Sequence, residues 1–238
     1  MLKCLVFFFS VFIYTCPLSA TLLDNLQKAQ KGDYIVTAQG KNYTLMHIYD
    51  RKENILTVEE ITAPSKIFQG KSTLWKAWIM QGAPYHTAWV MYSIDLKDGK
   101  MKAYYSLTKN RWVDMSKVDN FLTTLLNLNM LPIPFSDRKK VGLQLLKKGN
   151  RPLWQPKMIV EGREISGVFF DAFRTKWPND NSELSGKVIE VYVPRENERY
   201  PSYFPYWLEI SGVVGNAKIR IIDSGSKMDS PAPPLRKP

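Results

Sequence analysis

Short stretches in which apolar and polar residues alternate recur along most of the chain, and tight turns separate them. The clearest stretch lies at residues 206–222, where the alternation continues on both sides of a Gly- and Asn-containing connection at 212–216. This pattern predicts a β-hairpin with one buried face. The residues expected on that face are Tyr206, Leu208, Ile210, Ala217, Ile219 and Ile221, whereas Trp207 falls on the opposite face.

The same period predicts further strands over most of the chain. A three-stranded meander is expected within residues 33–61 and a hairpin within 85–108, with its turn at 97–100. More strands are expected at 157–173 and 184–196, and the segment 72–81 is interpreted as part of the strand surface. Consecutive strands joined by short turns favour an antiparallel sheet over a βαβ array. We therefore expect a curved antiparallel sheet of about eight to eleven strands.

Helices are expected at three places. Leucines at helical spacing predict a short amphipathic helix within residues 21–33. A capping-box pattern and an apolar stripe predict a helix within 114–131, ended by Pro132 and Pro134. Residues 137–150 are a candidate for another short helix. The expected fold class is α+β, with the helices packed on the concave face of the sheet.

The N-terminal residues 1–20 have the pattern of a secretory signal peptide. A single Lys3 precedes an uncharged run, and Leu18-Ser19-Ala20 ends it. Bulky Tyr14 and rigid Pro17 disfavour the alternative, a lipoprotein modified at Cys16. Both cysteines lie within this leader, so the exported chain has none and must depend on its apolar core. We expect a periplasmic protein.

Charge and motifs narrow the function. A formal net charge of +11 points to anionic lipid headgroups, acidic envelope polymers or envelope proteins, or simply to solubility. No nucleic-acid motif is present. The isolated His47 and His86 are expected to be packed in the sheet or on the surface, because no metal-ligand spacing surrounds them. No nucleophile motif or phosphate loop is present, so no enzyme activity, metal or cofactor is expected.

Carboxylate pairs offer no glycosidase site either. Glu59 and Glu60 are adjacent on a predicted strand and must point to opposite faces. Glu161 and Glu164 form a second close pair. We expect all four to be solvated residues at strand edges.

Large aromatic and sulfur side chains exceed what one buried sheet face needs. The candidate ligand-binding residues among them are Trp75, Trp78, Met80, Trp89, Met91 and Trp207. Two interpretations stay open: the helices cover a sheet that is apolar on both faces, or these residues line a cavity for an acyl chain.

The closing sequence "YFPYWLEISGVVGNAKIRIIDSG" and the order of elements resemble the periplasmic lipoprotein carriers of the LolA/LolB type. The resemblance implies an incomplete β-barrel lidded by helices, whose apolar interior takes the acyl chains of lipoproteins. We thus expect a leader at 1–20, one domain at 21–223 and a Pro-rich disordered tail at 224–238. The expected function is a non-enzymatic carrier of lipoprotein or lipid acyl chains, and the alternative is an envelope interaction or assembly module with a filled core.

Overall fold

The computed structural model describes residues 21–69, 74–118, 121–142, 151–195, 200–212 and 215–235, without the side chains of residues 117, 215 and 216. The predicted leader at residues 1–20 and most of the candidate helix at 137–150 lie outside these ranges.

Three short α-helices and two 3₁₀ helices accompany thirteen strands. The α-helices are α1 (Leu22–Leu26), α2 (Trp75–Met80) and α3 (Phe121–Asn127), and the 3₁₀ helices are η1 (Ser65–Phe68) and η2 (Met115–Lys117). The strands are β1 (Tyr34–Gln39), β2 (Asn42–Lys52), β3 (Ile55–Pro64), β4 (Ala88–Asp95), β5 (Lys100–Ser106), β6 (Arg111–Trp112), β7 (Leu131–Pro132), β8 (Met158–Val160), β9 (Arg163–Ile165), β10 (Phe170–Lys176), β11 (Val188–Pro194), β12 (Trp207–Gly212) and β13 (Gly215–Gly225).

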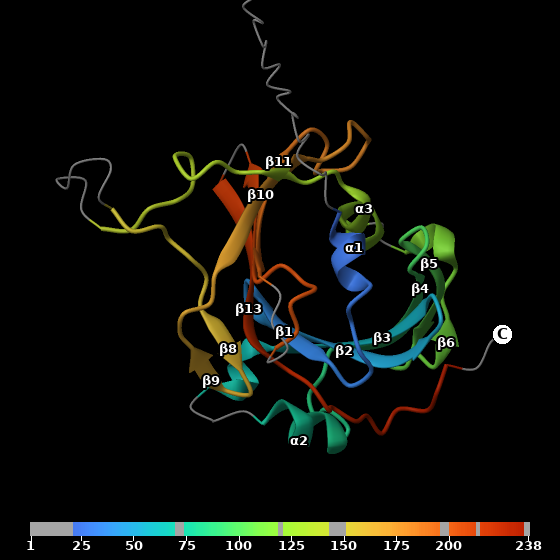
Figure 1. The fold of residues 1–238 in the computed structure, drawn as a ribbon. Helices are drawn as coiled ribbons and strands as arrows, with labels where there is room; N and C mark the ends of the chain where they lie inside the picture. Colours follow the sequence, from blue (N-terminus) through green and yellow to red (C-terminus); the bar gives the residue numbers. More distant parts are fainter. Residues whose placement is uncertain are drawn as a thin grey trace, which may run out of the picture.

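One antiparallel sheet contains eleven of these strands. Their order is β6-β5-β4-β3-β2-β1-β13-β12-β11-β10-β7, and β8 pairs with β9 separately. Strand β1 pairs with β13 from Tyr34↔Gly225 onward, so the first and last strands join the two halves of the sheet. The sheet curves strongly but β6 and β7 do not pair, which leaves it open (Figure 1).

The predicted antiparallel sheet is confirmed, and two local predictions are wrong. Residues 75–80 form helix α2 instead of strand surface, because Trp75, Trp78 and Ile79 follow the helical i, i+3, i+4 spacing. Residues 137–142, within the candidate helix at 137–150, form turns and an isolated bridge between Lys140 and Leu153.

Both faces of the sheet are covered by side chains. On one face, Leu56 and Val58 of β3 share a core with the leucines of α1 and α3. On the other, Ile61 of β3 and Leu45 of β2 pack with the tryptophans of α2. Because alternate strand residues point to opposite faces, a sheet covered on both sides needs apolar residues at both parities. This accounts for the aromatic excess seen in the sequence.

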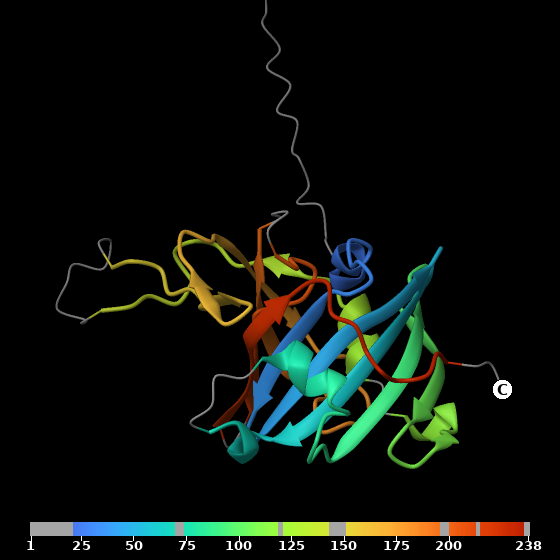
Figure 2. The same cartoon turned by 90° about the horizontal axis from the view of Figure 1, so that it is seen from below.

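The C-terminal segment after β13 crosses the α2 side of the sheet, and we call residues 226–235 the C-terminal strap (Figure 2). Met228 is only 2% exposed, and its N–H donates to the Gly32 carbonyl at 2.8 Å. Gly32 has a positive φ of +87°, and a Cβ there would come within 3.2 Å of the Lys227 backbone. The disorder predicted for residues 224–238 is therefore wrong up to residue 235. Proline prevents regular strand pairing, but an extended segment still packs through its side chains and carbonyls.

Candidate functional site

The six residues predicted to line one cavity lie in separate places. Trp75 and Trp78 are buried on α2 in T-shaped contact, with their ring centroids 6.0 Å apart and Phe68 against both. Met80, at the end of the same helix, is 54% exposed. Trp75, Trp78 and Phe68 belong to a filled core that attaches α2 to the sheet.

The other three predicted residues are on strands. Trp89 is half-buried and donates its indole N–H to Glu59 at 2.8 Å, while Met91 lies in a groove beneath Pro233 and Pro234 of the strap. Trp207, on β12, packs edge-on against Trp154 at 4.9 Å between centroids.

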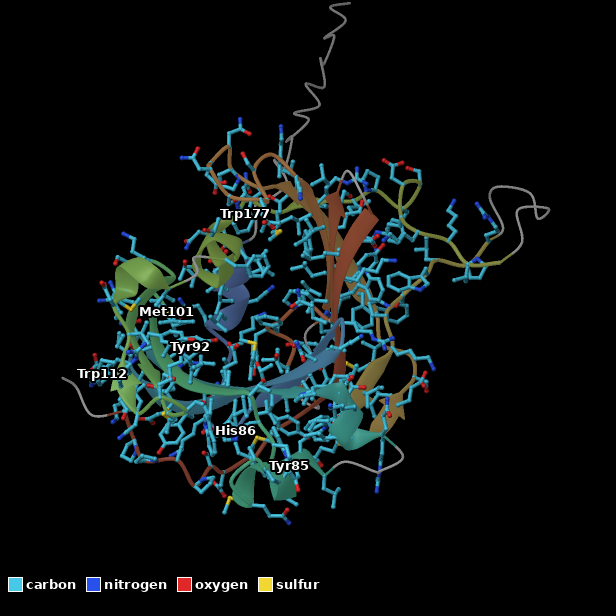
Figure 3. All side chains as sticks on the ribbon, turned by 180° about the vertical axis from the view of Figure 1, so that it is seen from behind. Tyr85, His86, Tyr92, Met101, Trp112 and Trp177 are labelled. Atoms are coloured by element: carbon cyan, nitrogen blue, oxygen red, sulfur yellow. The ribbon has the colours of Figure 1, made fainter. Side chains whose placement is uncertain are left out.

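A cleft of about 490 Å³ lies on the opposite face, the face that α1 and α3 also contact. Strands β3–β5 form one wall, and Val113, Val118 and the first residues of α3 form the other. Its apolar lining includes Val90, Tyr92, Met101, Tyr104, Phe121 and Leu122. Tyr92 and Met101 lie toward the hollow of the curved sheet in Figure 3, whereas Tyr85 lies on the other side, near α2. None of the six predicted residues lines this cleft.

Glu60 of β3 is the ionisable group within the apolar part of this cleft. The Tyr92 hydroxyl donates to its Oε2 at 3.1 Å, and the Tyr92 ring stacks on Tyr104 at 5.9 Å. Burial raises the pKa of the Glu60 carboxyl, and the hydrogen bond from Tyr92 opposes this shift only in part. The cleft thus holds a carboxyl group that its surroundings favour in the protonated form.

Basic side chains lie at the edge of the same cleft. Lys109 and Arg111 line it and are exposed, and neither forms an ion pair among the residues that the structure describes. Arg111 begins β6, the strand at the sheet edge, and Lys109 lies two residues before it. An apolar cleft with free cations at its mouth can bind an anionic amphiphile, with the apolar part inside.

The centre of the molecule is filled. Beneath α1, between Leu26, Ile48 and Tyr203, only about 20 Å³ remains open. Such a space holds about one water molecule. An acyl chain therefore has no room in the middle of the curved sheet, and the cleft at the β3–β6 end is the space available on that face.

A buried polar network lies across β3 from this cleft. The Glu59 carboxylate is fully buried and accepts from His47 Nδ1 at 2.9 Å, Trp89 Nε1 at 2.8 Å and Ser230 Oγ at 2.7 Å. His47 Nε2 lies 3.0 Å from the Met228 carbonyl. Both ring nitrogens of His47 are thus in hydrogen-bond contact, one with the Glu59 carboxyl and the other with the Met228 carbonyl. The network joins the strap to β2, β3 and β4.

The predicted orientation of the two adjacent glutamates is confirmed, but their predicted position at solvated strand edges is wrong. Glu59 and Glu60 do point to opposite faces, but neither lies on a solvated strand edge, because β3 is an interior strand. His47 is packed in the sheet, as expected. His86 is partly buried, with Nδ1 2.9 Å from the Ala83 carbonyl.

A second, more polar cleft of about 620 Å³ lies where the strap begins. It is lined by charged groups of both signs, including Lys76, Glu161, Asp33 and Lys227. Lys76 and Glu161 already pair at 2.6 Å, and burial raises the pKa of the Asp33 carboxyl. This cleft is lined by charged groups of both signs, whereas the first joins an apolar wall to a basic edge.

The described ranges contain histidine and acidic side chains and three short α-helices. Within them, no group of three or more His, Cys, Asp or Glu side chains is placed to hold a metal ion. The helices in the same part of the chain are too short and too polar to span a bilayer.

Sequence reasoning missed Glu60, Tyr92, Tyr104, Lys109 and Arg111. The signal that was available is parity: Glu60 shares its strand face with Leu56 and Val58, so it belongs to a buried face, not a solvated one. The position of the cleft depended on where η2 and α3 fold back, which no local pattern specifies.

Comparison with known proteins gives one family and a structural neighbour. The family model described as "CT021 protein" matches residues 44–166, slightly more than half of the chain, and this range contains every residue that lines the cleft. The fold is similar to the solved structure of the hypothetical protein CT021 from Chlamydia trachomatis, with a TM-score of 0.67 and 22% identity over 93% of this chain and 100% of that one. No curated protein matches the chain.

Proposed function

The chain belongs to the CT021 protein family, and from this shared scaffold we propose that it is a non-enzymatic binding protein for anionic amphiphiles such as fatty acids or lipid acyl chains. The observation that carries the proposal is the cleft of about 490 Å³ between β3–β5 on one side and Val113, Val118 and α3 on the other. Its walls are largely apolar, and its volume falls within the range of small-molecule sites.

The charge at the edge of the cleft supports an anionic ligand. Lys109 and Arg111 lie beside the apolar wall and form no ion pair among the described residues. A carboxylate or phosphate headgroup would meet two cations there, while its acyl chain would lie against Val90 and Phe121.

The arrangement of the helices supports the same proposal. Leucines of α1 and α3 share a core with Leu56 and Val58 of β3, and we infer that these helices act as a lid on the concave face of the sheet. Helix α2 packs with the other core and stays outside this role. A lid made of short helices can move by small displacements to admit a chain.

The proposed place of action is the periplasm, after removal of residues 1–20. The support is the leader pattern of Lys3, an uncharged run and Ala20. Mass measurement of the exported chain should show a new N-terminus at Thr21, and an intact leader would contradict this.

An envelope assembly module remains a second candidate, and the strap bears on it. The module hypothesis used the Pro-rich tail as a partner contact. Residues 228–232 instead contact this chain's own sheet, through the Met228 carbonyl, Ser230 and the Ala232 carbonyl. A partner would first have to detach these groups, so the open cleft favours the carrier.

The proposal is tested with a fluorescent fatty acid. Ala88→Trp places an indole in the cleft, and Met80→Trp adds the same group at an exposed position of α2. We expect Ala88→Trp to weaken binding at least ten-fold while Met80→Trp binds as the wild type does. Circular dichroism checks that both variants are folded. Equal binding by both variants, or none by the wild type, would refute the carrier.

A further inference from the structure

The cleft has two polar ends that lie on one line across the sheet. In the strand register, Glu60 pairs with Val90, Val90 with Ser106, and Ser106 with Arg111. These residues therefore form one cross-strand row from interior strand β3 to edge strand β6. Three strand spacings separate its ends, which corresponds to roughly 14 Å between the backbones.

The inner end of this row is the Glu60 carboxyl, which is only partly hydrogen-bonded within the described residues. Glu60 Oε2 accepts from the Tyr92 hydroxyl, but its Oε1 has no hydrogen-bond partner among the described residues. The neighbouring lining is Val90, Tyr92 and Tyr104, which leaves a polar oxygen facing an apolar space. A plain alkyl chain reaching this point would bury that oxygen without a partner, which is unfavourable.

The outer end of the row carries positively charged side chains. Arg111 ends the row and Lys109 lies two residues before it, and both are exposed at the cleft edge. Ser106, between the two ends, is buried and its Oγ already accepts from the Lys109 N–H. The stretch between carboxyl and cations is therefore apolar in effect, with Val90, Val113 and Phe121 around it.

Building on the proposed function, we propose that the cleft selects a doubly polar amphiphile: an anionic headgroup at Lys109 and Arg111, an apolar body, and a hydroxyl or amino group that hydrogen-bonds Glu60. The remote polar group is what distinguishes this ligand class from ordinary fatty acids. A site built to hydrogen-bond a ligand group discriminates strongly against the analogue that lacks it.

Glu60 Oε1 can accept a hydrogen bond, and burial raises the pKa of this carboxyl relative to a solvated glutamate. A ligand hydroxyl can donate to that oxygen without bringing a charge of its own into the cleft. The chemistry at this end therefore suits a hydroxyl particularly well.

The experiment compares octanoate, dodecanoate and hexadecanoate with their ω-hydroxy derivatives, by displacement of the fluorescent fatty acid. The wild type should bind at least one ω-hydroxy acid about ten-fold more tightly than its parent, at the chain length that spans the row. Glu60→Leu should abolish or reverse this preference, whereas Glu60→Gln, which keeps an acceptor and a donor, should retain most of it.

A second set of variants tests whether Lys109 and Arg111 bind the anionic headgroup. Lys109→Glu combined with Arg111→Glu should weaken both ligand series equally and leave the hydroxyl preference unchanged. Lys97→Glu combined with Lys100→Glu, at the exposed β4–β5 turn, is the charge-matched control.

The outcomes separate this inference from the proposed function. Equal affinity for parent and ω-hydroxy acids at every length, with Ala88→Trp still blocking both, would overturn the selectivity and leave the carrier intact. Failure of every acid to bind the wild type would overturn both. An unchanged preference in Glu60→Leu would show that another group recognises the hydroxyl and would also overturn the inference.

Discussion

Removing the Glu59 carboxylate should destabilise the protein and free the strap. In Glu59→Ala, His47 Nδ1, Trp89 Nε1 and Ser230 Oγ all lose their common acceptor. A buried polar group left without its hydrogen-bond partner costs about 1–3 kcal/mol, so leaving three of them unpaired should cost about 3–5 kcal/mol or more. For a domain of this size we expect the melting temperature to fall by roughly 6–20 °C.

Glu59→Gln is the matched variant. Its amide oxygen can accept from Trp89 and Ser230, and its amide N–H can donate to Nδ1 of a neutral His47. The His47 Nε2 hydrogen bond to the Met228 carbonyl then survives. We therefore expect a loss of only about 1 kcal/mol, the net value of an ordinary hydrogen bond.

The assay is urea denaturation of both variants, combined with limited proteolysis of the strap. Cleavage after Lys227 should become fast in Glu59→Ala and stay slow in Glu59→Gln. If both variants lose less than about 1 kcal/mol, or if Gln costs as much as Ala, the network does not hold the strap as argued.

Two more predictions follow from buried polar groups. Burial raises the pKa of Glu60 in the folded state above its ordinary value of 4.5, so the unfolded chain releases this proton at a lower pH than the folded chain. The stability that comes from the protonated Glu60 is therefore fully present below about pH 4.5 and is lost as the pH rises through the folded-state pKa. Urea denaturation from pH 4 to 7 should show a shallower decline in Glu60→Gln than in the wild type; parallel curves would contradict the assignment. Tyr206 is 1% exposed and donates to Ser224 Oγ at 2.6 Å, so Tyr206→Ala should cost about 3–5 kcal/mol and Tyr206→Phe about 1 kcal/mol. Equal losses would show that the ring contributes little beyond its hydroxyl.

The strands could be predicted because their signal is local. Period-two alternation and short turns are properties of a few neighbouring residues, and they placed the meander, the turn at 97–100 and the last hairpin where β1–β5, β12 and β13 occur. The buried Leu208 and Ile210 followed from the same parity. The exposed Ala217 did not, because it lies near the turn of the hairpin, two residue pairs from Gly212↔Gly215.

Helix α2 was missed because two local signals compete there. Trp, Ile and Met favour a half-buried strand surface by composition, whereas Trp75, Trp78 and Ile79 have helical spacing. The spacing is decisive because it lets one side of a six-residue helix bury three large side chains against Leu45 and Ile61. Composition alone could not give this result.

The strap and its network could not be predicted from any local pattern. His47 contacts a carbonyl 181 positions away, and Glu59 accepts from a serine 171 positions away. A segment with several prolines has no periodic signal, and its order depends on carbonyls that find donors on a distant face. The low-complexity composition therefore predicted disorder where tertiary contacts supply order.

The two adjacent glutamates of β3 illustrate how a structural group differs from a binding group. The pleat sends Glu59 and Glu60 to opposite faces, and both lose most of their water there. Glu59 has three hydrogen-bond partners, one of which is His47, so a substitution of Glu59 should reduce stability. Glu60 accepts one hydrogen bond, from Tyr92, and lines an open cleft, so its carboxyl can still accept a hydrogen bond from a ligand. A buried polar group that lacks a hydrogen-bond partner is costly unless a ligand or water supplies one. For Glu60, the cleft provides the space for such a ligand.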